Sequence, residues 1–132
     1  MILGVGLDIC QVERIRRSLK KFGYDWADEA FTANERKLCE QGPDPALLFA
    51  RSLCGKEACF KALGTGRTAD IDWHDIEVLQ PDLSVALKLS GGALDELQRI
   101  TPPGHDPVLH ITCSGNGDLA QAIVVISAAK KR

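Results

Sequence analysis

We expect this chain to adopt an α+β fold in which a mostly antiparallel sheet packs on a long central helix. Two changes in the spacing of apolar residues support this class. After a short apolar opening, residues 11–63 show mainly helical spacing, whereas from Asp75 onward apolar residues alternate in steps of two around a single helical segment. The expected order is therefore one strand and three helices, followed by two strands, a helix and two strands.

The first strand is expected in the opening run MILGVGLDI, which places Asp8 at the end of a buried strand. The next segment, residues 11–22, has apolar residues at helical spacing and basic residues on its other side. Its apolar positions are Val12, Ile15, Leu19 and Phe22. This pattern predicts an amphipathic helix with a positively charged outer face.

Local capping signals place the next two helices. Thr32 and Glu35 have the spacing of a capping box and predict a short helix over residues 33–40. After a break containing glycine and prolines, a second helix is expected over residues 45–63, with proline in its first turn and Gly64 as its left-handed cap. This helix is the longest and most apolar in the chain and is expected to be the central one.

The remaining elements follow from the two-residue alternation. Residues 76–78 and 85–89 predict a hairpin, and residues 93–100 predict a helix that ends before a Thr-Pro-Pro-Gly segment. Two final strands are expected over residues 108–113 and 120–127, joined by an SGNGD turn. No linker divides the chain, so residues 1–132 are expected to form a single domain.

Composition excludes several classes of protein. With 16 Lys plus Arg against 18 Asp plus Glu, the net charge of −2 lacks the global basic field of a nucleic-acid binder. The apolar share of 45% is too high for a disordered chain, and no apolar stretch approaches the roughly 20 residues that span a bilayer. The five cysteines have no paired spacing and the N-terminus does not resemble a signal peptide. We therefore expect reduced thiols and a cytoplasmic location.

The segment CGKEACFKALGTG at residues 54–66 places charged side chains in an otherwise apolar helix. Glu57 and Lys61 are four residues apart and share one helix face. One interpretation is an ordinary intrahelical ion pair, worth about 0.2–0.5 kcal/mol, that only solvates the helix. The other is that both residues belong to a functional site, which requires other parts of the chain to converge there.

Asp8 is the partner that favours a functional site. Two carboxylates from different elements, Asp8 and Glu57, could ligate Mg²⁺, which commonly takes one or two protein carboxylates and completes its shell with water and phosphates. Lys61 and Lys56 could balance phosphate charge. The following turn consists of Gly64, Thr65 and Gly66, and its two glycines would let backbone amides approach a phosphate. The simpler alternatives are that Asp8 is only a helix N-cap and Gly64 only a C-cap.

Together these segments resemble a known family. The chain is similar over nearly its whole length to the holo-acyl-carrier-protein synthase type of 4′-phosphopantetheinyl transferase. The resemblance is carried mainly by GVGLDICQVERI (4–15), FTANE (31–35) and GKEACFKALGTG (55–66), and further by DIDWHDIEV (70–78) and LAQAIVVIS (119–127). It implies the fold of that family and an enzyme that transfers the 4′-phosphopantetheine arm of coenzyme A to a serine of an apo carrier protein, releasing adenosine 3′,5′-bisphosphate.

The resemblance also implies roles for individual residues. Asp8 and Glu57 would hold Mg²⁺ on the pyrophosphate, Glu57 would help to deprotonate the attacking serine, and Lys61 would stabilise the leaving phosphate. Coenzyme A would contact Lys56, Lys61 and the turn of Gly64, Thr65 and Gly66. The acidic helix of an acyl carrier protein would dock on Arg14, Arg17 and Lys21. A homotrimer with shared active sites, and a place in fatty acid biosynthesis, are implied as well.

Two departures from the family pattern support an alternative hypothesis. The arginine of the family's RFAAKEA segment is shifted to Arg51, leaving Ser52 in its place, and Gly115 stands where the family has a histidine, with His110 the nearest one. On a helix, a shift of one position turns a side chain by about 100°. The alternative is a non-catalytic homologue that binds carrier proteins but whose coenzyme A site has decayed.

Overall fold

The structure is a computed structural model that describes residues 1–64, 70–79 and 85–132. Its strands are β1 (Ile2–Gln11), β2 (Ile76–Leu79), β3 (Ala86–Leu89), β4 (His105–Gly115) and β5 (Leu119–Lys130). Its α-helices are α1 (Val12–Phe22), α2 (Ala33–Glu40), α3 (Pro45–Leu63) and α4 (Gly91–Ile100), and two 3-10 helices are η1 (Tyr24–Glu29) and η2 (Trp73–Asp75). The predicted α+β class and the predicted order of strands and α-helices are confirmed.

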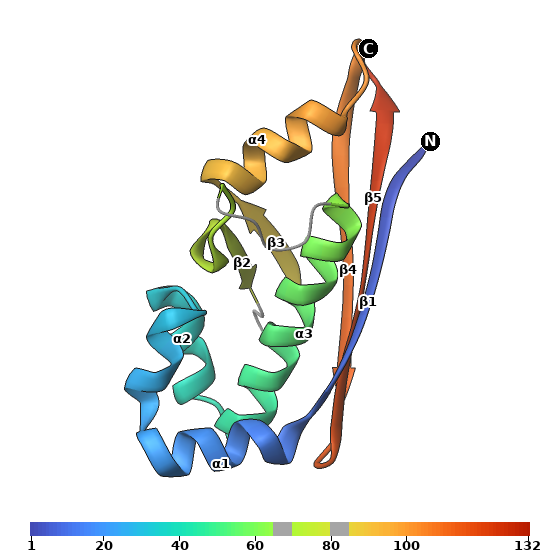
Figure 1. Cartoon of the computed structure of the whole chain (residues 1–132). Coiled ribbons are helices and arrows are strands. Elements are labelled where there is room, and N and C mark those ends of the chain that lie inside the picture. The colour runs from blue at the N-terminus through green and yellow to red at the C-terminus, as the bar shows by residue number, and fades with distance from the viewer. Residues whose placement is uncertain (65–69, 80–84) are drawn as a thin grey trace.

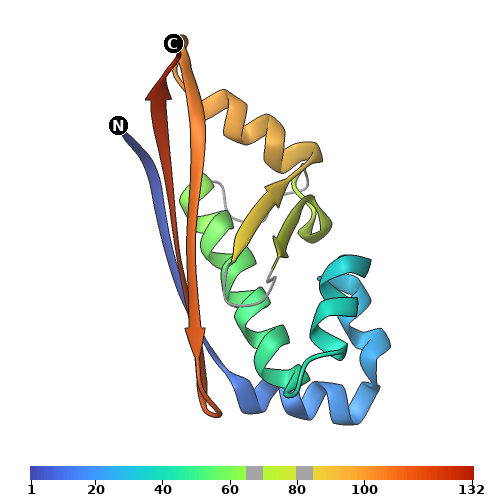
Figure 2. The ribbon, with the colours of Figure 1, turned by 180° about the vertical axis from the view of Figure 1, so that it is seen from behind.

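The strands form two antiparallel sheets. The larger has the order β1-β5-β4, and the smaller is the hairpin of β2 and β3. Helix α3 runs along one face of the larger sheet, and the hairpin stands on the other side of α3 (Figures 1 and 2). Helices α1 and α2 lie at one end of the sheet, whereas α4 and both termini lie toward the other. The opposite face of the larger sheet has no helix over it in the described part of the chain.

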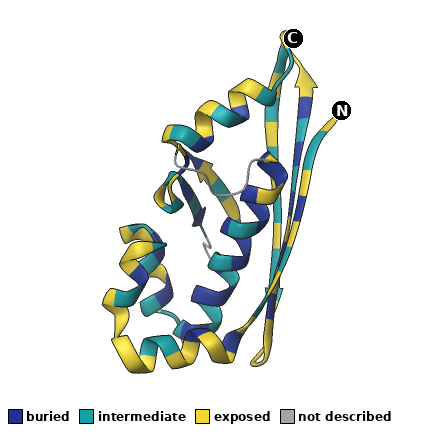
Figure 3. Cartoon of the chain, viewed as in Figure 1, coloured by how far each residue is buried: buried dark blue, intermediate teal, exposed yellow. Residues whose placement is uncertain are grey.

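The main core lies between α3 and the larger sheet. On β5 the side chains that face α3 are almost fully buried, and they alternate with exposed or half-buried residues (Figure 3). The buried set on this strand is Ala120, Ala122, Val124, Ile126 and Ala128. The alternation anticipated from the sequence is therefore present, and it continues beyond the predicted ends of both C-terminal strands, from His105 paired with Lys130 to Gly115 paired with Ala120.

Helix α3 has the ends that its local sequence predicts. The Asp44 side chain accepts a hydrogen bond from the Leu47 amide at 3.5 Å, and proline occupies the first turn. Gly64 has a positive φ of 82° and donates its amide to the Lys61 carbonyl. The capping box of α2 is also present, with Thr32 and Glu35 bonding reciprocally at 2.8 and 3.1 Å.

Some predictions differ from the structure. Asp8 is not at the end of β1, because the pairing with β5 continues to Gln11 opposite Leu119. Neither 3-10 helix was expected, since six residues or fewer carry too little apolar periodicity to be recognised. The connection between the two strands of the predicted hairpin, residues 80–84, lies outside the described residues. Among those that are described, no helix has both the length and the apolar character needed to cross a membrane.

Candidate functional site

A cleft of about 700 Å³ opens where β1, α1 and α3 meet. Two carboxylates, Asp8 and Glu57, and two cations, Arg14 and Lys61, are among its lining residues. The structure therefore brings together residues that are up to 53 positions apart in the sequence. A functional site at Glu57 and Lys61 requires residues from other parts of the chain to lie beside them, and Asp8 and Arg14 do so.

Glycines allow β1 to lie directly against the backbone of α3. A Cβ atom on Gly6 would be 1.8 Å from the Ala58 carbonyl oxygen, and one on Gly4 would be 1.9 Å from that of Ala62. No side chain larger than hydrogen fits at these positions without moving strand or helix. This close approach explains how Asp8, two residues after Gly6, reaches the charged face of α3.

Asp8 and Lys61 form an ion pair in the cleft. Lys61 Nζ lies 3.1 Å from Asp8 Oδ1 and donates a second hydrogen bond to the Leu7 carbonyl oxygen at 3.0 Å. The pair is solvent-accessible, because the Asp8 side chain is 22% exposed and the Lys61 side chain is 53% exposed. Such a pair contributes little to stability, so it can reorganise when an anion enters the cleft.

The donor set of the cleft fits a hard divalent cation. Asp8 and Glu57 supply carboxylate oxygens from two rigid elements, and the open cleft leaves room for water and phosphate ligands. Within residues 1–64, 70–79 and 85–132 there is no cluster of three or more His, Cys, Asp or Glu side chains placed to hold a metal. Asp8 and Glu57 are the residues of this cleft that could ligate such a cation.

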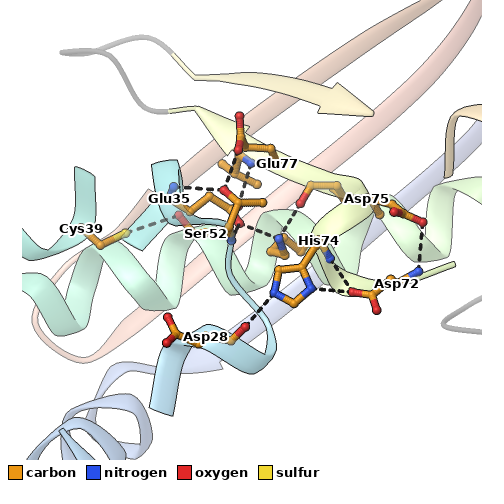
Figure 4. Close-up of polar contacts among 12 residues, drawn as sticks. Asp28, Glu35, Cys39, Ser52, Asp72, His74, Asp75 and Glu77 are labelled. Carbon is orange, nitrogen blue, oxygen red and sulfur yellow. Dashed lines mark hydrogen bonds and ion pairs between the residues drawn. The ribbon is translucent and has the colours of Figure 1, made fainter. Parts of the chain in front are cut away.

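Lys56 lies elsewhere. Its side chain is fully buried, and Nζ contacts Glu35 Oε1 at 2.6 Å and the Ile76 carbonyl oxygen. Glu35 is also fully buried, and its second carboxylate oxygen accepts the Val78 amide (Figure 4). Burial raises the pKa of Glu35 and lowers that of Lys56, and the attraction between the two opposes both shifts. The expected contact of Lys56 with phosphate is not seen, because its ammonium group is enclosed between α2, α3 and β2.

The expected glycine turn is described only at its start. Gly64 caps α3 in the left-handed conformation. This conformation suits both a simple helix cap and the start of a phosphate-contacting turn. Thr65 and Gly66 lie outside the described residues. Asp8 is not the N-cap of α1, because Gln11 occupies that position without a side-chain hydrogen bond.

The expected docking residues on α1 are exposed. Arg14, Arg17 and Lys21 all have solvent-accessible side chains, and Arg14 also lines the cleft. Arg16, on the same helix, bonds instead to Asp44 through two contacts of 3.2 and 3.4 Å. The basic face of α1 therefore continues directly into the cleft.

Sequence reasoning missed one wall of the cleft. Trp26 lines it from η1, and its ring lies 6.3 Å from that of Phe31. His74 fastens η1 to η2, because Nε2 lies 2.7 Å from the Asp28 carbonyl oxygen and Nδ1 lies 2.6 Å from Asp72 Oδ1 (Figure 4). The only sequence signal for this wall was an isolated tryptophan without a helical or strand pattern around it.

The two departures from the family pattern also have defined places. Ser52 is fully buried, with its hydroxyl 3.8 Å from the Cys39 sulfur (Figure 4). Arg51 is half-buried, and its Nε has no hydrogen-bond partner. Gly115 lines a shallow hollow of about 400 Å³ at the β4–β5 turn, and His110 contacts Ser127 Oγ at 3.2 Å. His110 and Gly115 therefore occupy different places on β4.

Comparison with known proteins identifies the family. Residues 4–103 match the model described as the 4′-phosphopantetheinyl transferase superfamily. The chain belongs to this superfamily. Among its relatives, the holo-[acyl-carrier-protein] synthase of Methylorubrum populi is 43% identical, with 97% of this chain and 95% of that protein covered. The protein of the same name from Caulobacter vibrioides is 39% identical over the full length of both chains.

Solved structures of transferases in this superfamily share the fold. The holo-[acyl-carrier-protein] synthase of Neisseria meningitidis superposes with a TM-score of 0.81 at 28% identity, covering 96% of this chain and 99% of that one. The enzyme of Helicobacter pylori, solved in complex with coenzyme A, has a TM-score of 0.75 at 25% identity and covers 93% and 99%. The phosphopantetheinyl transferase fold anticipated from the sequence is thus confirmed.

Proposed function

We propose that this protein is a holo-[acyl-carrier-protein] synthase, transferring the 4′-phosphopantetheine group of coenzyme A to a serine of an apo acyl carrier protein. The observation that carries the proposal is the meeting of Asp8, Glu57 and Lys61 in one cleft of a phosphopantetheinyl transferase fold. Relatives matched over almost their whole length carry that name, and one solved relative holds coenzyme A. No observation favours the alternative of a non-catalytic carrier-binding homologue.

The reaction exchanges the phosphoanhydride oxygen of the coenzyme A pyrophosphate for a serine ester oxygen. The serine hydroxyl oxygen forms a bond to the phosphorus that carries the pantetheine arm, the bond to the bridging oxygen breaks, and adenosine 3′,5′-bisphosphate leaves. In this proposal the Glu57 carboxylate accepts the serine proton, and the Lys61 ammonium group balances negative charge on the leaving phosphate. In this role Lys61 contacts both Asp8 and the substrate phosphate. The Lys61–Asp8 pair is exposed, so the lysine side chain can adjust to make both contacts.

Asp8 and Glu57 are the residues that would hold Mg²⁺. When bound, the cation would neutralise charge on the pyrophosphate of coenzyme A. The two carboxylates would orient it because they project from β1 and α3, whose backbones are in direct contact through Gly4 and Gly6. Gly64, Thr65 and Gly66 remain the proposed phosphate-contacting turn.

The carrier protein is proposed to dock on α1. The exposed basic residues of this helix, Arg14, Arg17 and Lys21, suit an acidic helix of the partner, and Arg14 also lines the cleft. Complementary charge of this kind accelerates encounter and makes it dependent on salt.

We propose a homotrimer from the family resemblance, and the uncovered face of the larger sheet supports an interface between copies of the chain. The side chains on that face include a contiguous apolar group, comprising Val5, Leu7, Ile9 and Ile123, that is 46–59% exposed. Apolar sheet faces of this kind are normally covered. Ile9 and Leu119 belong to this exposed apolar surface and also line the cleft, so a neighbouring subunit on this face would border the active site.

We further propose that residues 1–132 form one domain and that the protein acts in the cytoplasm in fatty acid biosynthesis, in keeping with its five free thiols.

The proposed function is tested by incubating the protein with coenzyme A, Mg²⁺ and an apo acyl carrier protein. The carrier should gain the mass of one phosphopantetheinyl group in intact-mass spectrometry. Glu57→Gln and Lys61→Met should each slow transfer by about 100-fold or more while keeping the fold, because each removes a group that acts on developing charge. Glu96→Gln, which removes a carboxylate on α4, is the matched control and should transfer normally.

Calorimetry separates the proposal from its alternative. An active transferase should bind coenzyme A more tightly with Mg²⁺ than without it, and Asp8→Asn should reduce that difference. A carrier that stays unmodified, together with coenzyme A binding that ignores Mg²⁺, would establish the non-catalytic homologue instead.

A further inference from the structure

Two cysteine thiols meet at the boundary between the cleft and the core. Cys10 lies on β1, is half-buried and lines the cleft. Cys54 lies on α3 and is fully buried. The two thiols are close enough that their interaction lowers the pKa of Cys10 and raises that of Cys54, and both thiols are free. The protein therefore holds two reduced sulfurs as near neighbours.

Strand pairing gives the same placement independently. Cys10 stands opposite Ala120 in the register of β1 and β5. The Cys54 sulfur lies 3.5 Å from the carbonyl oxygen of that same Ala120. Cys54 thus sits directly beneath the strand pair that carries Cys10, and side chains from β1 and α3 are long enough to meet because Gly6 brings the strand onto the helix backbone.

Access distinguishes Cys10 from the other thiols. The cleft opens onto Cys10, whereas Cys39, Cys54 and Cys59 are fully buried. Cys113 is half-buried, its sulfur contacts the Arg51 carbonyl oxygen, and burial raises its pKa to about 11. A small oxidant that enters the cleft therefore meets Cys10 first, with Cys54 as the neighbouring thiol.

We propose that Cys10 and Cys54 form a reversible disulfide when the cleft is exposed to a peroxide, and that this bond switches the site off. The Cys10 sulfur attacks one peroxide oxygen, the O–O bond breaks, and a sulfenic acid and one water result. The Cys54 sulfur then attacks the Cys10 sulfur, the S–O bond breaks, and its thiol proton leaves with the hydroxyl as a second water. The two thiols are oxidised by two electrons, and the peroxide is reduced to water.

The bond would act on the catalytic carboxylates through the backbone. Cys10 is two residues from Asp8, and Cys54 is three residues from Glu57 on α3. A disulfide requires the sulfurs to approach to about 2.0 Å, closer than any non-bonded contact, so strand and helix must shift relative to each other. That shift would change the separation of Asp8 and Glu57, and the effect on activity rests on the proposed function.

The test is oxidation of the full-length protein with hydrogen peroxide, followed by removal of the oxidant before coenzyme A is added. Mass spectrometry of unreduced peptides should find a Cys10–Cys54 cross-link, and dithiothreitol should remove it. Transfer activity should fall by about 10-fold or more after oxidation and recover on reduction, each sample being compared with its own untreated portion. Cys54→Ala should abolish the cross-link and the reversible loss, whereas Cys113→Ala, the matched control, should keep both.

The two parts of the proposal fail separately. A Cys54–Cys113 cross-link, or Cys10 converted to sulfinic acid without a cross-link, would overturn the thiol pair regardless of any transferase activity. A Cys10–Cys54 cross-link that leaves transfer unchanged would overturn the switch. Absence of transfer before oxidation would instead count against the proposed function, while the cross-link could still be mapped.

Discussion

Lys56 Nζ lies 2.6 Å from Glu35 Oε1, and neither side chain is exposed to solvent. Backbone groups use part of the remaining bonding capacity of the pair. The Ile76 carbonyl oxygen accepts from Lys56, and the Thr32 and Val78 amides donate to Glu35, each at 2.8 Å. One ion pair thus joins α2, α3 and β2 behind the cleft.

Lys56→Met should destabilise the protein by about 3–5 kcal/mol, because it leaves a buried carboxylate without its cation. Urea unfolding followed by circular dichroism measures this. Glu96→Gln removes one partner of the surface pair with Arg99 and should change the free energy of unfolding much less. An unfolding midpoint for Lys56→Met equal to that of the wild type would show that the pair is not needed for stability.

The position of Lys56 shows where sequence reasoning stops. Lys56 and Glu57 are adjacent, so their side chains leave the helix about 100° apart. Helix α3 is contacted by the larger sheet, by β2 and by α1, α2 and α4, and the side that carries Glu57 and Lys61 faces the cleft. Which of the two charged residues faces the cleft depends on these long-range contacts, which local spacing does not contain.

Other features were predictable because their causes are local. The Thr32–Glu35 capping box and the left-handed Gly64 are set by residues within one helical turn, and both are present as predicted. Asp8 and Glu57 can be paired from the sequence only by assuming that charged residues in apolar surroundings converge. Their common cleft depends on the packing of β1 at Gly4 and Gly6, and the register of that packing cannot be read from the sequence.

His74→Gln should lower stability more at about pH 5.5 than at about pH 8.5. Partial burial opposes protonation, but hydrogen bonds to the Asp28 carbonyl and the Asp72 carboxylate outweigh it and raise the pKa of His74 above its ordinary value of 6.5. Both partners can only accept hydrogen bonds, so the doubly protonated ring is the stabilised form. A raised histidine pKa stabilises the fold fully below pH 6.5, and this contribution is lost as the pH rises through the folded-state pKa.

The measurement is urea unfolding of the wild type and of His74→Gln across that pH range. The charged groups that act on His74 are Asp72, which favours the cation, and Lys56, which disfavours it. Asp72→Asn should therefore remove most of the pH-dependent difference. A difference between wild type and variant that grows as the pH rises would contradict the assignment.

Reversing charge on α1 should weaken carrier binding without damaging the site. The double variant Arg17→Glu and Lys21→Glu should raise the KM for an acidic carrier protein by about 10-fold with little change in kcat. Lys131→Glu is the matched control, because it reverses a charge at the C-terminal end of the chain, away from α1. Added salt should raise the KM of the wild type toward that of the double variant, and a salt-independent KM would exclude electrostatic docking.

Ile123→Lys should dissociate the proposed trimer. Its side chain is 46% exposed at the centre of the uncovered apolar sheet face, opposite Leu7 on β1, and three buried ammonium groups in a trimer interface would be unfavourable. Light scattering coupled to size-exclusion chromatography should give a trimer for the wild type and a monomer for the variant. Leu94→Lys, on the exposed surface of α4, should remain trimeric. A wild-type protein that elutes as a monomer would refute the assembly itself.

Gly6→Ala should be among the most damaging single substitutions in the chain. The added Cβ would lie 1.8 Å from the Ala58 carbonyl oxygen, and neither atom can move without shifting β1 from α3. Overpacking of this kind costs about 1–3 kcal/mol or more.

Gly117→Ala is the control, because a Cβ there meets nothing within 4 Å. The Gly6 variant should unfold at lower urea and lose transfer activity even where it is still folded, because Asp8 moves away from Glu57 and Lys61. A Gly6 variant with wild-type stability and activity would show that the close contact of strand and helix does not position the cleft.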